Sequence, residues 1–197
     1  MAATEDSRRR LVAGAADMIR RRGLAATSVR ELAKHAHAPL GSTYHYFPGG
    51  KTQLAAEAVG YAGDTVTGML ERRLRQGPTE GLRAFLHTWR KILVDSDFRA
   101  GCPVLAVAVE DVPEAEGAPR AAAAAAFTAW TGLIASTLRE HGVEQPAAES
   151  TAILIIAAFE GSLAMCRAER STAALDRVAE QLERVLHATL ETTDSEK

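Results

Sequence analysis

The chain has 197 residues, which suits one domain or a small module joined to a larger one. Hydrophobic residues make up 47% and charged residues 24%, a globular composition that excludes a disordered chain, and the net charge of −2 excludes a basic field over the whole molecule. Two cysteines cannot form a disulfide framework. With no long uninterrupted apolar run and no signal or transit peptide pattern, a soluble cytoplasmic protein is expected.

The charges are distributed unevenly along the chain. Residues 1–51 hold nine basic and four acidic residues, whereas the remainder holds 14 basic and 21 acidic residues. A basic module joined to an acidic body predicts that only the front of the chain meets a polyanion. Because solvated helix faces also carry arginine clusters, charge alone leaves nucleic-acid binding open.

The pattern along the chain predicts an all-α fold of about nine helices without a sheet. Alanine occupies 39 positions, and apolar residues recur at the helical period. A first helix carries an apolar stripe from Leu11 to Ile19 and ends before Gly23. A short second helix follows Thr27 or Ser28 as its cap, since Glu31 stands at capping-box spacing from Ser28.

A third helix is predicted over 41–47, after a turn over 35–40, and Pro48-Gly49-Gly50 ends it. The run Val104 to Val109 suits a buried strand by composition, although the helical context favours a short buried helix. Asp111 to Pro119 is rich in acid, proline and glycine and is predicted to be a loop. Longer helices are predicted over 51–75, 82–93, 120–141, 146–168 and about 172–190.

The last two helices offer more apolar surface than one chain of this size can cover. Thr151 to Phe159 carry no charge, and a helix that is apolar all round must be buried on more than one side. We expect a two-fold dimer in which residues 147–168 and 172–190 form a four-helix bundle with the partner. The alternative is a monomer with one helix threaded through its core.

The three helices of residues 5–47 have the outline of a helix-turn-helix. A recognition helix that enters the major groove of double-stranded DNA needs small residues for close approach and exposed donors for bases and phosphates. Phe47 is the expected core anchor of this module. The polar and aromatic face suited to DNA consists of Gly41, Ser42, Thr43, Tyr44, His45 and Tyr46.

The stretch TSVRELAKHAHAPLGSTYHYFPGGKTQL, from Thr27 to Leu54, resembles the DNA-binding domain of the TetR family of bacterial transcriptional regulators. The Pro-Gly-Gly-Lys variant and GCPVLAVAVE, residues 101–110, resemble the LmrA/YxaF branch. The resemblance implies a helix-turn-helix DNA-binding domain over 1–50 and a helical effector-binding and dimerisation domain over 51–197. No enzymatic activity, cofactor or metal is expected, since no nucleophile-elbow, Walker or dinucleotide glycine pattern appears and no metal-ligand spacing is supported.

The resemblance also implies roles for individual residues. Thr27 and Ser28 would contact backbone phosphates at the N-terminus of the second helix, where anions are favoured. Thr43, Tyr44 and His45 would face base edges or the groove wall, and Tyr46 and Lys51 would bind the flanking phosphates.

Two positions depart from the family pattern. Leu40 stands where the branch often has lysine, and His37 replaces the usual turn glycine, which costs free energy if the backbone there has a positive φ. Arg8 to Arg10 could add phosphate contacts from an arm, or could be the solvated start of the first helix.

The acidic body is expected to bind a small-molecule effector. Two carboxylates on apolar stretches, Glu110 and Glu160, could bind a cationic or hydroxylated ligand, pair with Arg167 or Arg170, or reach solvent. Apolar candidates for the pocket or the plain core are Met69, Phe85, Trp89, Phe127, Trp130 and Met165.

Other functional signals are weaker. His35 and His37 lack supporting ligands for a metal. Cys102 and Cys166 are more typical of buried thiols than of a redox sensor. No nucleotide-binding or nucleophile motif is present. We expect a homodimeric repressor released from a palindromic operator by a small, largely apolar effector. The alternatives are an activator, a helical enzyme without identifiable catalytic residues, and a sequestering protein with a vestigial DNA-binding head.

Overall fold

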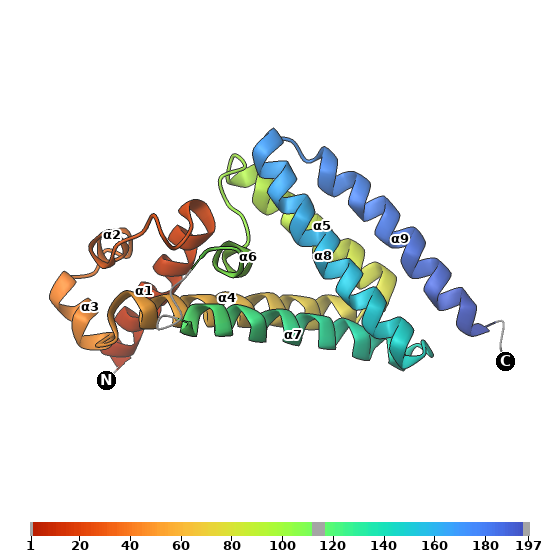
Figure 1. Ribbon diagram of the computed structural model, residues 1–197, viewed down its shortest axis with the longest axis horizontal. Coiled ribbons are helices and arrows are strands. Elements are labelled where there is room, and N and C mark those ends of the chain that lie inside the picture. The colour runs from red at the N-terminus through yellow and green to blue at the C-terminus, as the bar shows by residue number, and fades with distance from the viewer. Residues whose placement is uncertain (1, 112–116, 195–197) are drawn as a thin grey trace. The chain divides into compact units, whose positions relative to one another are not determined.

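The computed structural model describes residues 2–111 and 117–194, and within these ranges it contains nine α-helices and no β-strand (Figure 1). The all-α prediction is therefore confirmed. In chain order the helices are α1 (Ala2–Arg22), α2 (Val29–His35), α3 (Leu40–Tyr46), α4 (Gly50–Leu74), α5 (Pro78–Asp95), α6 (Pro103–Ala108), α7 (Ala118–Glu140), α8 (Gln145–Glu169) and α9 (Ala173–Asp194).

The structure shows the conformation of one segment whose secondary structure was undecided and the extent of one predicted loop. The run Val104–Val109 belongs to helix α6 and not to a strand, with Pro103 in its first turn, where a missing N–H costs nothing. The predicted loop Asp111–Pro119 is shorter than expected, because α7 already begins at Ala118. Residues 112–116 of that loop lie outside the described residues.

The chain forms two compact units. The head unit comprises Met1–Thr65 and Cys102–Ala126, and the body unit comprises Val66–Gly101 and Phe127–Lys197. Helices α4 and α7 each contribute to both units. In this division the first part of α4 and the whole of α6 belong to the same unit as α1, α2 and α3.

In the head unit, α1 packs against α2, α3 and α6 (Figure 1). The apolar stripe of α1 is buried as predicted, with Leu11 and Ile19 fully enclosed. Phe47, the expected anchor, is also buried at the end of α3. Burying a side chain of this size contributes about 2–3 kcal/mol, enough to hold the two-turn α3 that would not be stable alone.

In the body unit, α9 packs against both α8 and α5, and α8 also contacts α5. The apolar stripe of α9 faces these helices, with Leu175, Leu182 and Leu186 buried. Two cross-helix pairs flank this contact: Arg83 with Glu183 at 2.8 Å, and Arg90 with Asp176 at 2.8 Å. The stripe of α9 is thus largely covered within the protomer.

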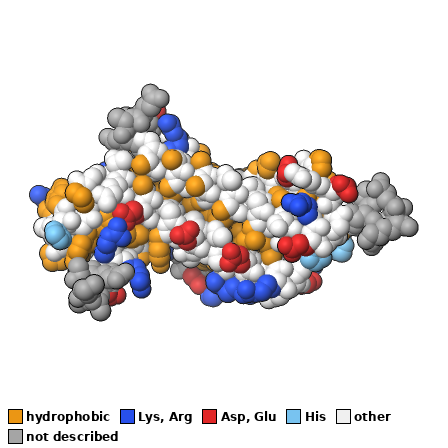
Figure 2. All heavy atoms as spheres, turned by 90° about the horizontal axis from the view of Figure 1, so that it is seen from below, with side chains coloured by type: hydrophobic (Ala, Val, Ile, Leu, Met, Phe, Trp, Pro, Cys, Tyr) orange, Lys and Arg blue, Asp and Glu red, His pale blue; other side chains and the backbone are white. Residues whose placement is uncertain are grey.

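Two helices are unusually apolar. By length and composition alone, α7 and α8 could each cross a membrane, although half of the apolar window of α8 is buried inside the protein. The core helix of a soluble protein has the same properties. Figure 2 shows one face of the molecule, on which acidic and basic side chains are interspersed with exposed hydrophobic ones.

Candidate nucleic-acid interface

The start of α2 is organised by a capping box. The N–H of Glu31 donates to Ser28 Oγ at 3.2 Å, and the N–H of Ser28 donates to Glu31 Oε2 at 3.0 Å. The Ser28 hydroxyl also donates to Glu31 Oε2 at 2.7 Å, and this bond, together with the one from the Ser28 N–H, lowers the pKa of Glu31 below its ordinary value. The capping box predicted from the spacing is confirmed, and the exposed Ser28 remains at a position suited to a phosphate.

Thr27, by contrast, faces the interior. Its side chain is buried, and its hydroxyl donates to the carbonyl oxygen of Leu24 at 2.7 Å. Its side chain is therefore not exposed toward a phosphate. Its role in the head is to fix the loop that leads into α2.

The turn between α2 and α3 contains His37 in the left-handed region, with φ of 52°. A glycine would adopt this conformation without steric cost, whereas histidine adopts it at some cost in free energy. The N–H of Ala38 donates to the carbonyl of Ala33 at 2.9 Å and closes the turn. Pro39 then caps α3 in an extended conformation. The strain foreseen at His37 is therefore present.

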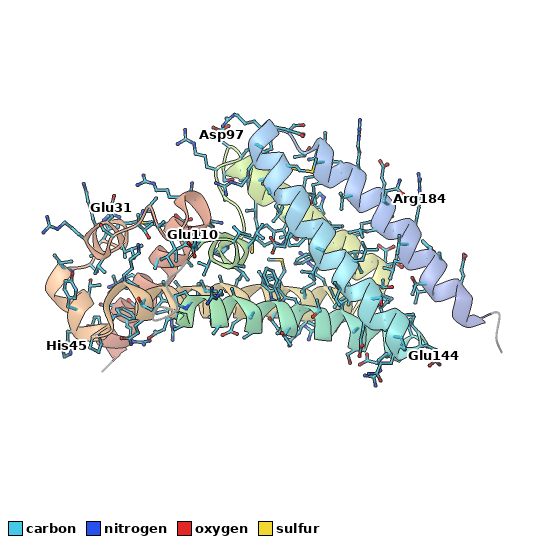
Figure 3. The ribbon with its side chains drawn as sticks, in the orientation of Figure 1. Glu31, His45, Asp97, Glu110, Glu144 and Arg184 are labelled. Atoms are coloured by element: carbon cyan, nitrogen blue, oxygen red, sulfur yellow. The ribbon has the colours of Figure 1, made fainter. Side chains whose placement is uncertain are left out.

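Helix α3 has an inner and an outer face. Thr43 is completely buried, and its hydroxyl donates to the carbonyl oxygen of Pro39 at 3.2 Å, which corrects the expectation that it faces base edges. On the outer face Tyr44 is 55% exposed, and His45 is exposed at the position labelled in Figure 3. No heavy atom beyond the helix lies near Gly41, so close approach from outside is open.

The turn between α3 and α4 is held by a chain of hydrogen bonds. The N–H of Gly49 donates to Gln53 Oε1 at 2.9 Å, Gln53 Nε2 donates to Glu57 Oε1 at 3.1 Å, and Arg8 Nη2 donates to Glu57 Oε2 at 2.5 Å. Lys51 stands in the first turn of α4, partly exposed, next to this chain.

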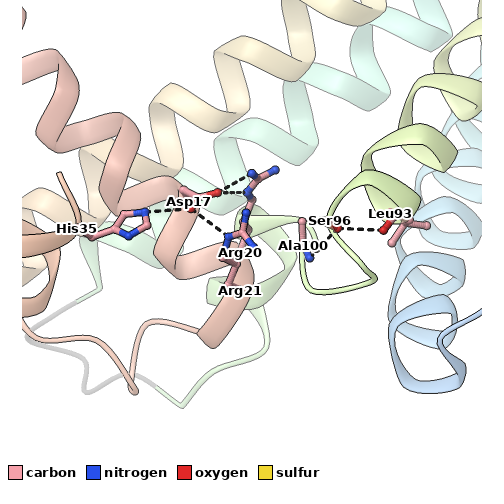
Figure 4. Close-up of polar contacts among 7 residues, drawn as sticks. All are labelled: Asp17, Arg20, Arg21, His35, Leu93, Ser96 and Ala100. Atoms are coloured by element: carbon pink, nitrogen blue, oxygen red, sulfur yellow. Dashed lines mark hydrogen bonds and ion pairs between the residues drawn. The ribbon is translucent and has the colours of Figure 1, made fainter.

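Asp17 on α1 connects the first two helices (Figure 4). Its carboxylate accepts from Arg20 Nε at 2.7 Å and Arg21 Nε at 3.0 Å, and lies 3.0 Å from His35 Nε2 on α2. Partial burial alone would raise the pKa of Asp17, but the two arginines lower it on balance. Among the described residues, no group of three or more His, Cys, Asp or Glu could hold a metal ion.

The expected effector residues fall into several environments. In the body unit, the rings of Phe85 and Trp89 meet Phe159 at centroid distances of 5.0 and 5.2 Å, and Glu160 is buried next in sequence. Phe159 was not among the expected pocket residues, although it lies at the end of the uncharged stretch of α8. Trp130 is buried against the partly exposed Phe127.

The remaining effector candidates are placed differently. Met165 is 52% exposed, which corrects the expectation that it lines an enclosed pocket, and Met69 is only partly buried. Both oxygens of Glu110 accept hydrogen bonds from backbone N–H groups in the head unit, those of Leu24 and Ala25. A ligand contact is therefore not the role that the geometry gives Glu110.

Both cysteines are buried, and neither is part of a disulfide. Burial raises the pKa of the Cys166 thiol, and the N–H of Leu175 donates to its sulfur at 3.4 Å. A raised thiol pKa lowers the fraction of reactive thiolate. The environment of Cys166 therefore favours a structural role over redox sensing.

Comparison with known proteins gives two family matches. A model described as "Bacterial regulatory proteins, tetR family" matches residues 11–58, and one described as "Transcriptional regulator LmrA/YxaF-like, C-terminal domain" matches residues 78–181. An uncharacterised HTH-type transcriptional regulator of Mycobacterium tuberculosis (strain ATCC 25618 / H37Rv) is 42% identical over 187 residues, covering 93% of this chain and 95% of that protein. The HTH-type transcriptional regulator LmrA of Bacillus subtilis (strain 168) is 30% identical over 162 residues, covering 80% and 85%.

Solved structures have the same fold. The regulatory protein TetR from Rhodobacter sphaeroides superposes with a TM-score of 0.80 at 22% identity, covering 90% of this chain and 97% of that one. A TetR transcriptional regulator from Legionella pneumophila gives a TM-score of 0.79 at 19% identity, covering 89% and 94%. At these identities the likeness concerns the fold alone.

Proposed function

This chain belongs to the TetR family of helix-turn-helix transcriptional regulators, with an LmrA/YxaF-like C-terminal domain, and we propose that it acts as a homodimeric repressor released from a palindromic operator by a small, largely apolar effector. The family is non-enzymatic, and its members are soluble bacterial proteins. The cytoplasm, where the operator DNA lies, is the proposed location.

The DNA-binding proposal rests on one observation, that α3 has a buried face and an exposed face. Thr43 and Phe47 anchor the inner face in the head, while Tyr44 and His45 present hydrogen-bonding groups outward. A rigid helix with exposed donors and a glycine at its start, Gly41, suits close approach to base edges in the major groove. In this proposal Tyr44 and His45 contribute to sequence recognition.

Phosphate contacts would position this helix on the duplex. Lys51 begins α4, Tyr46 is partly exposed at the end of α3, and Ser28 is exposed at the N-terminus of α2. Ser28 and Lys51 flank the recognition helix in sequence, and Tyr46 is its last residue. Contacts of this kind fix orientation without reading sequence.

The dimer proposal rests on α8. Ile153 is 61% exposed and Leu154 is 46% exposed, and with Met165 they leave apolar side chains of one buried-core helix in solvent. The apolar stripe of α9 is largely covered within the protomer, and three of the four exposed large hydrophobic residues described in the body unit lie on α8, the fourth being Val94 on α5. A second copy that packs α8 against α8, with α9 alongside, would bury it in an isologous interface.

The effector proposal rests on the aromatic cluster of the body unit. Trp89 is buried, and its indole Nε1 has no hydrogen-bond acceptor among the described residues. A buried donor without an acceptor costs free energy, so a ligand with an acceptor group next to these rings would be favoured. Such a ligand would be aromatic or aliphatic over most of its surface, with few polar groups.

Selection of binding sites from random DNA tests this proposal. Wild-type protein is expected to enrich a sequence with two-fold symmetry, and footprinting on that sequence should protect two half-sites about 35 Å apart or a modest multiple of that distance. Enrichment of an asymmetric site would contradict a symmetric dimer. Failure to enrich any sequence would contradict a sequence-specific regulator.

A further inference from the structure

The carboxylate of Glu110 binds the loop that leads from α1 into α2. The N–H of Leu24 donates to Oε1 at 2.6 Å, and the N–H of Ala25 donates to Oε2 at 2.8 Å; Glu110 itself is labelled in Figure 3. Glu110 lies in the segment matched by the C-terminal family model, whereas Leu24 and Ala25 lie in the segment matched by the N-terminal model. A carboxylate that accepts two adjacent backbone N–H groups makes charge-assisted bonds of defined geometry.

Gly23 adapts the loop to this carboxylate in two ways. Its φ of +79° lies in the left-handed region, where glycine has no steric penalty. In addition, a Cβ at this position would overlap with Glu110 Oε1 as that side chain now lies. Gly23 therefore leaves room for the carboxylate where it now lies, and a side chain there would require the flexible end of Glu110 to shift.

The bound loop continues directly into the helix-turn-helix. Leu24 is buried, and its carbonyl oxygen accepts from both the hydroxyl and the N–H of Thr27, at 2.7 and 3.1 Å. Thr27 precedes Ser28, the N-cap of α2. Helix α6, which ends two residues before Glu110, packs against α1, so Glu110 follows an element that is itself packed in the head unit.

We infer that Glu110 is a positioning residue for DNA binding: through its two hydrogen bonds, the α6 segment holds the α1–α2 loop, and with it the helix-turn-helix, in the arrangement that reads DNA. This inference rests on the proposed function. A dimer must place two recognition helices at a set spacing, so a loosened head weakens specific binding more than it weakens phosphate-driven non-specific binding. Glu110 itself does not touch DNA in this proposal.

The first test is amide hydrogen exchange, which needs neither DNA nor effector. In Glu110→Gln the amide NH2 group replaces one acceptor, so at least one of the two bonds is lost with little change in volume. The amides of Leu24 and Ala25 are expected to exchange about tenfold faster or more. The control is Asp111→Asn, a change at the exposed neighbouring carboxylate, which should leave both rates unchanged. Equal rates in Glu110→Gln and wild type would overturn the contact.

A double-mutant cycle tests the fit of Gly23 to Glu110. Gly23→Ala introduces both backbone strain and a collision with the carboxylate, and Glu110→Ala removes only the collision. Gly23→Ala is expected to raise the unfolding equilibrium constant in both backgrounds. The factor by which it does so should be at least about five times smaller when residue 110 is already alanine. The control is Gly77→Ala, a residue with φ of +93° and open space around it, which should have the same effect in both backgrounds. An equal effect of Gly23→Ala in both backgrounds would overturn the proposed fit.

DNA binding tests the positioning role itself, with a sequence selected by the wild-type protein as the probe. Glu110→Gln is expected to weaken binding to this DNA about tenfold or more, while binding to scrambled DNA, its salt dependence and the thermal midpoint change little. Glu110→Gln could instead bind the selected DNA with wild-type affinity although the amides of Leu24 and Ala25 exchange faster. That result would overturn the positioning role of Glu110 without contradicting the proposed function. If the wild-type protein selects no sequence, the proposed function fails, and the positioning role fails with it.

Discussion

The guanidinium of Arg8 lies 5.1 Å from the centroid of the Phe47 ring, so α1 covers the residue that anchors the end of the recognition helix. The same guanidinium donates to Glu57 on α4. Its neighbour Arg10 pairs with Asp6 on α1 at 2.6 Å. The geometry therefore gives Arg8 a place within the head, and the run of arginines is part of helix α1 and not a separate arm.

Replacing Arg8 should destabilise the head slightly. Arg8→Met keeps much of the alkyl chain but removes the charge over the ring and the ion pair, each worth about 0.5–1 kcal/mol at a partly exposed site. We expect the free energy of unfolding in urea to fall by about 1 kcal/mol, and by less at high salt. Arg9→Met, at the exposed neighbouring position, serves as the control. Equal losses for the two variants would contradict the contact with Phe47.

Substitutions on the proposed DNA-binding face should distinguish residues that bind phosphates from residues that recognise bases. Lys51→Ala is expected to weaken binding to all sequences similarly and to make the salt slope shallower by about one, because one phosphate contact is lost. Tyr44→Phe or His45→Ala should instead change the preferred sequence. Both effects can be followed by fluorescence anisotropy on a panel of duplexes.

The buried Thr43 provides the matched control on the same helix. Thr43→Val keeps the shape but removes the hydroxyl that donates to Pro39, so stability should fall by about 1 kcal/mol while sequence preference stays unchanged. A change of preference in Thr43→Val, or a change of preference in Lys51→Ala without one in the outer-face variants, would show that α3 docks differently.

Much of this head could be predicted from the sequence, because its signals are local. The capping box of Ser28 and Glu31, the glycine and proline stops and the apolar stripe of α1 depend on neighbours in the chain. The inner position of Thr43 could not be predicted, since a short polar side chain on a two-turn helix gives no periodic signal. It depends on the tertiary packing of α3.

Glu110 shows the same limit over a longer distance. A carboxylate at the end of an apolar run predicts that this group needs a hydrogen-bond or ion-pair partner. It does not predict which partner, and here the partners are two backbone N–H groups 86 and 85 residues away in the sequence. A clue lies in Gly23, which the sequence marks only as a helix stop. Likewise, the exposure of Met165 follows from which face of α8 the rest of the chain covers.

The Asp17 network should make stability depend on pH. Partial burial opposes ionisation, yet the hydrogen bonds from Arg20 and Arg21 hold the pKa of Asp17 below its ordinary value. The stabilisation is therefore complete above the unfolded pKa, about 3.9, and is lost as the pH falls through the lower folded pKa. Asp17→Asn should be less stable than wild type by about 0.5–1 kcal/mol at pH 7, with a difference that shrinks below about pH 4. Urea denaturation across this pH range would contradict the account if the difference grew on acidification.

A charge on the exposed face of α8 should break the dimer. Ile153→Glu places a carboxylate in the proposed interface, where central contacts contribute about 2 kcal/mol or more, so the dimer dissociation constant should rise about thirtyfold or more. Val94→Glu, on the similarly exposed Val94 of α5, is the control and should leave association unchanged. Sedimentation equilibrium measures both. An unaffected dimer in Ile153→Glu would mean that another surface forms the interface.

The central claim, that the head reads DNA sequence, is tested most directly by fluorescence anisotropy on DNA from just upstream of this protein's own gene, titrated against scrambled DNA over a salt series. Six to ten phosphate contacts predict a loss of affinity of about 10³–10⁵ between roughly 50 and 200 mM salt. We predict a preference for the upstream DNA of about 10³ or more. Equal, weak binding to both duplexes would contradict regulation at that site, and equal binding to every duplex tested would favour a sequestering protein with a vestigial head.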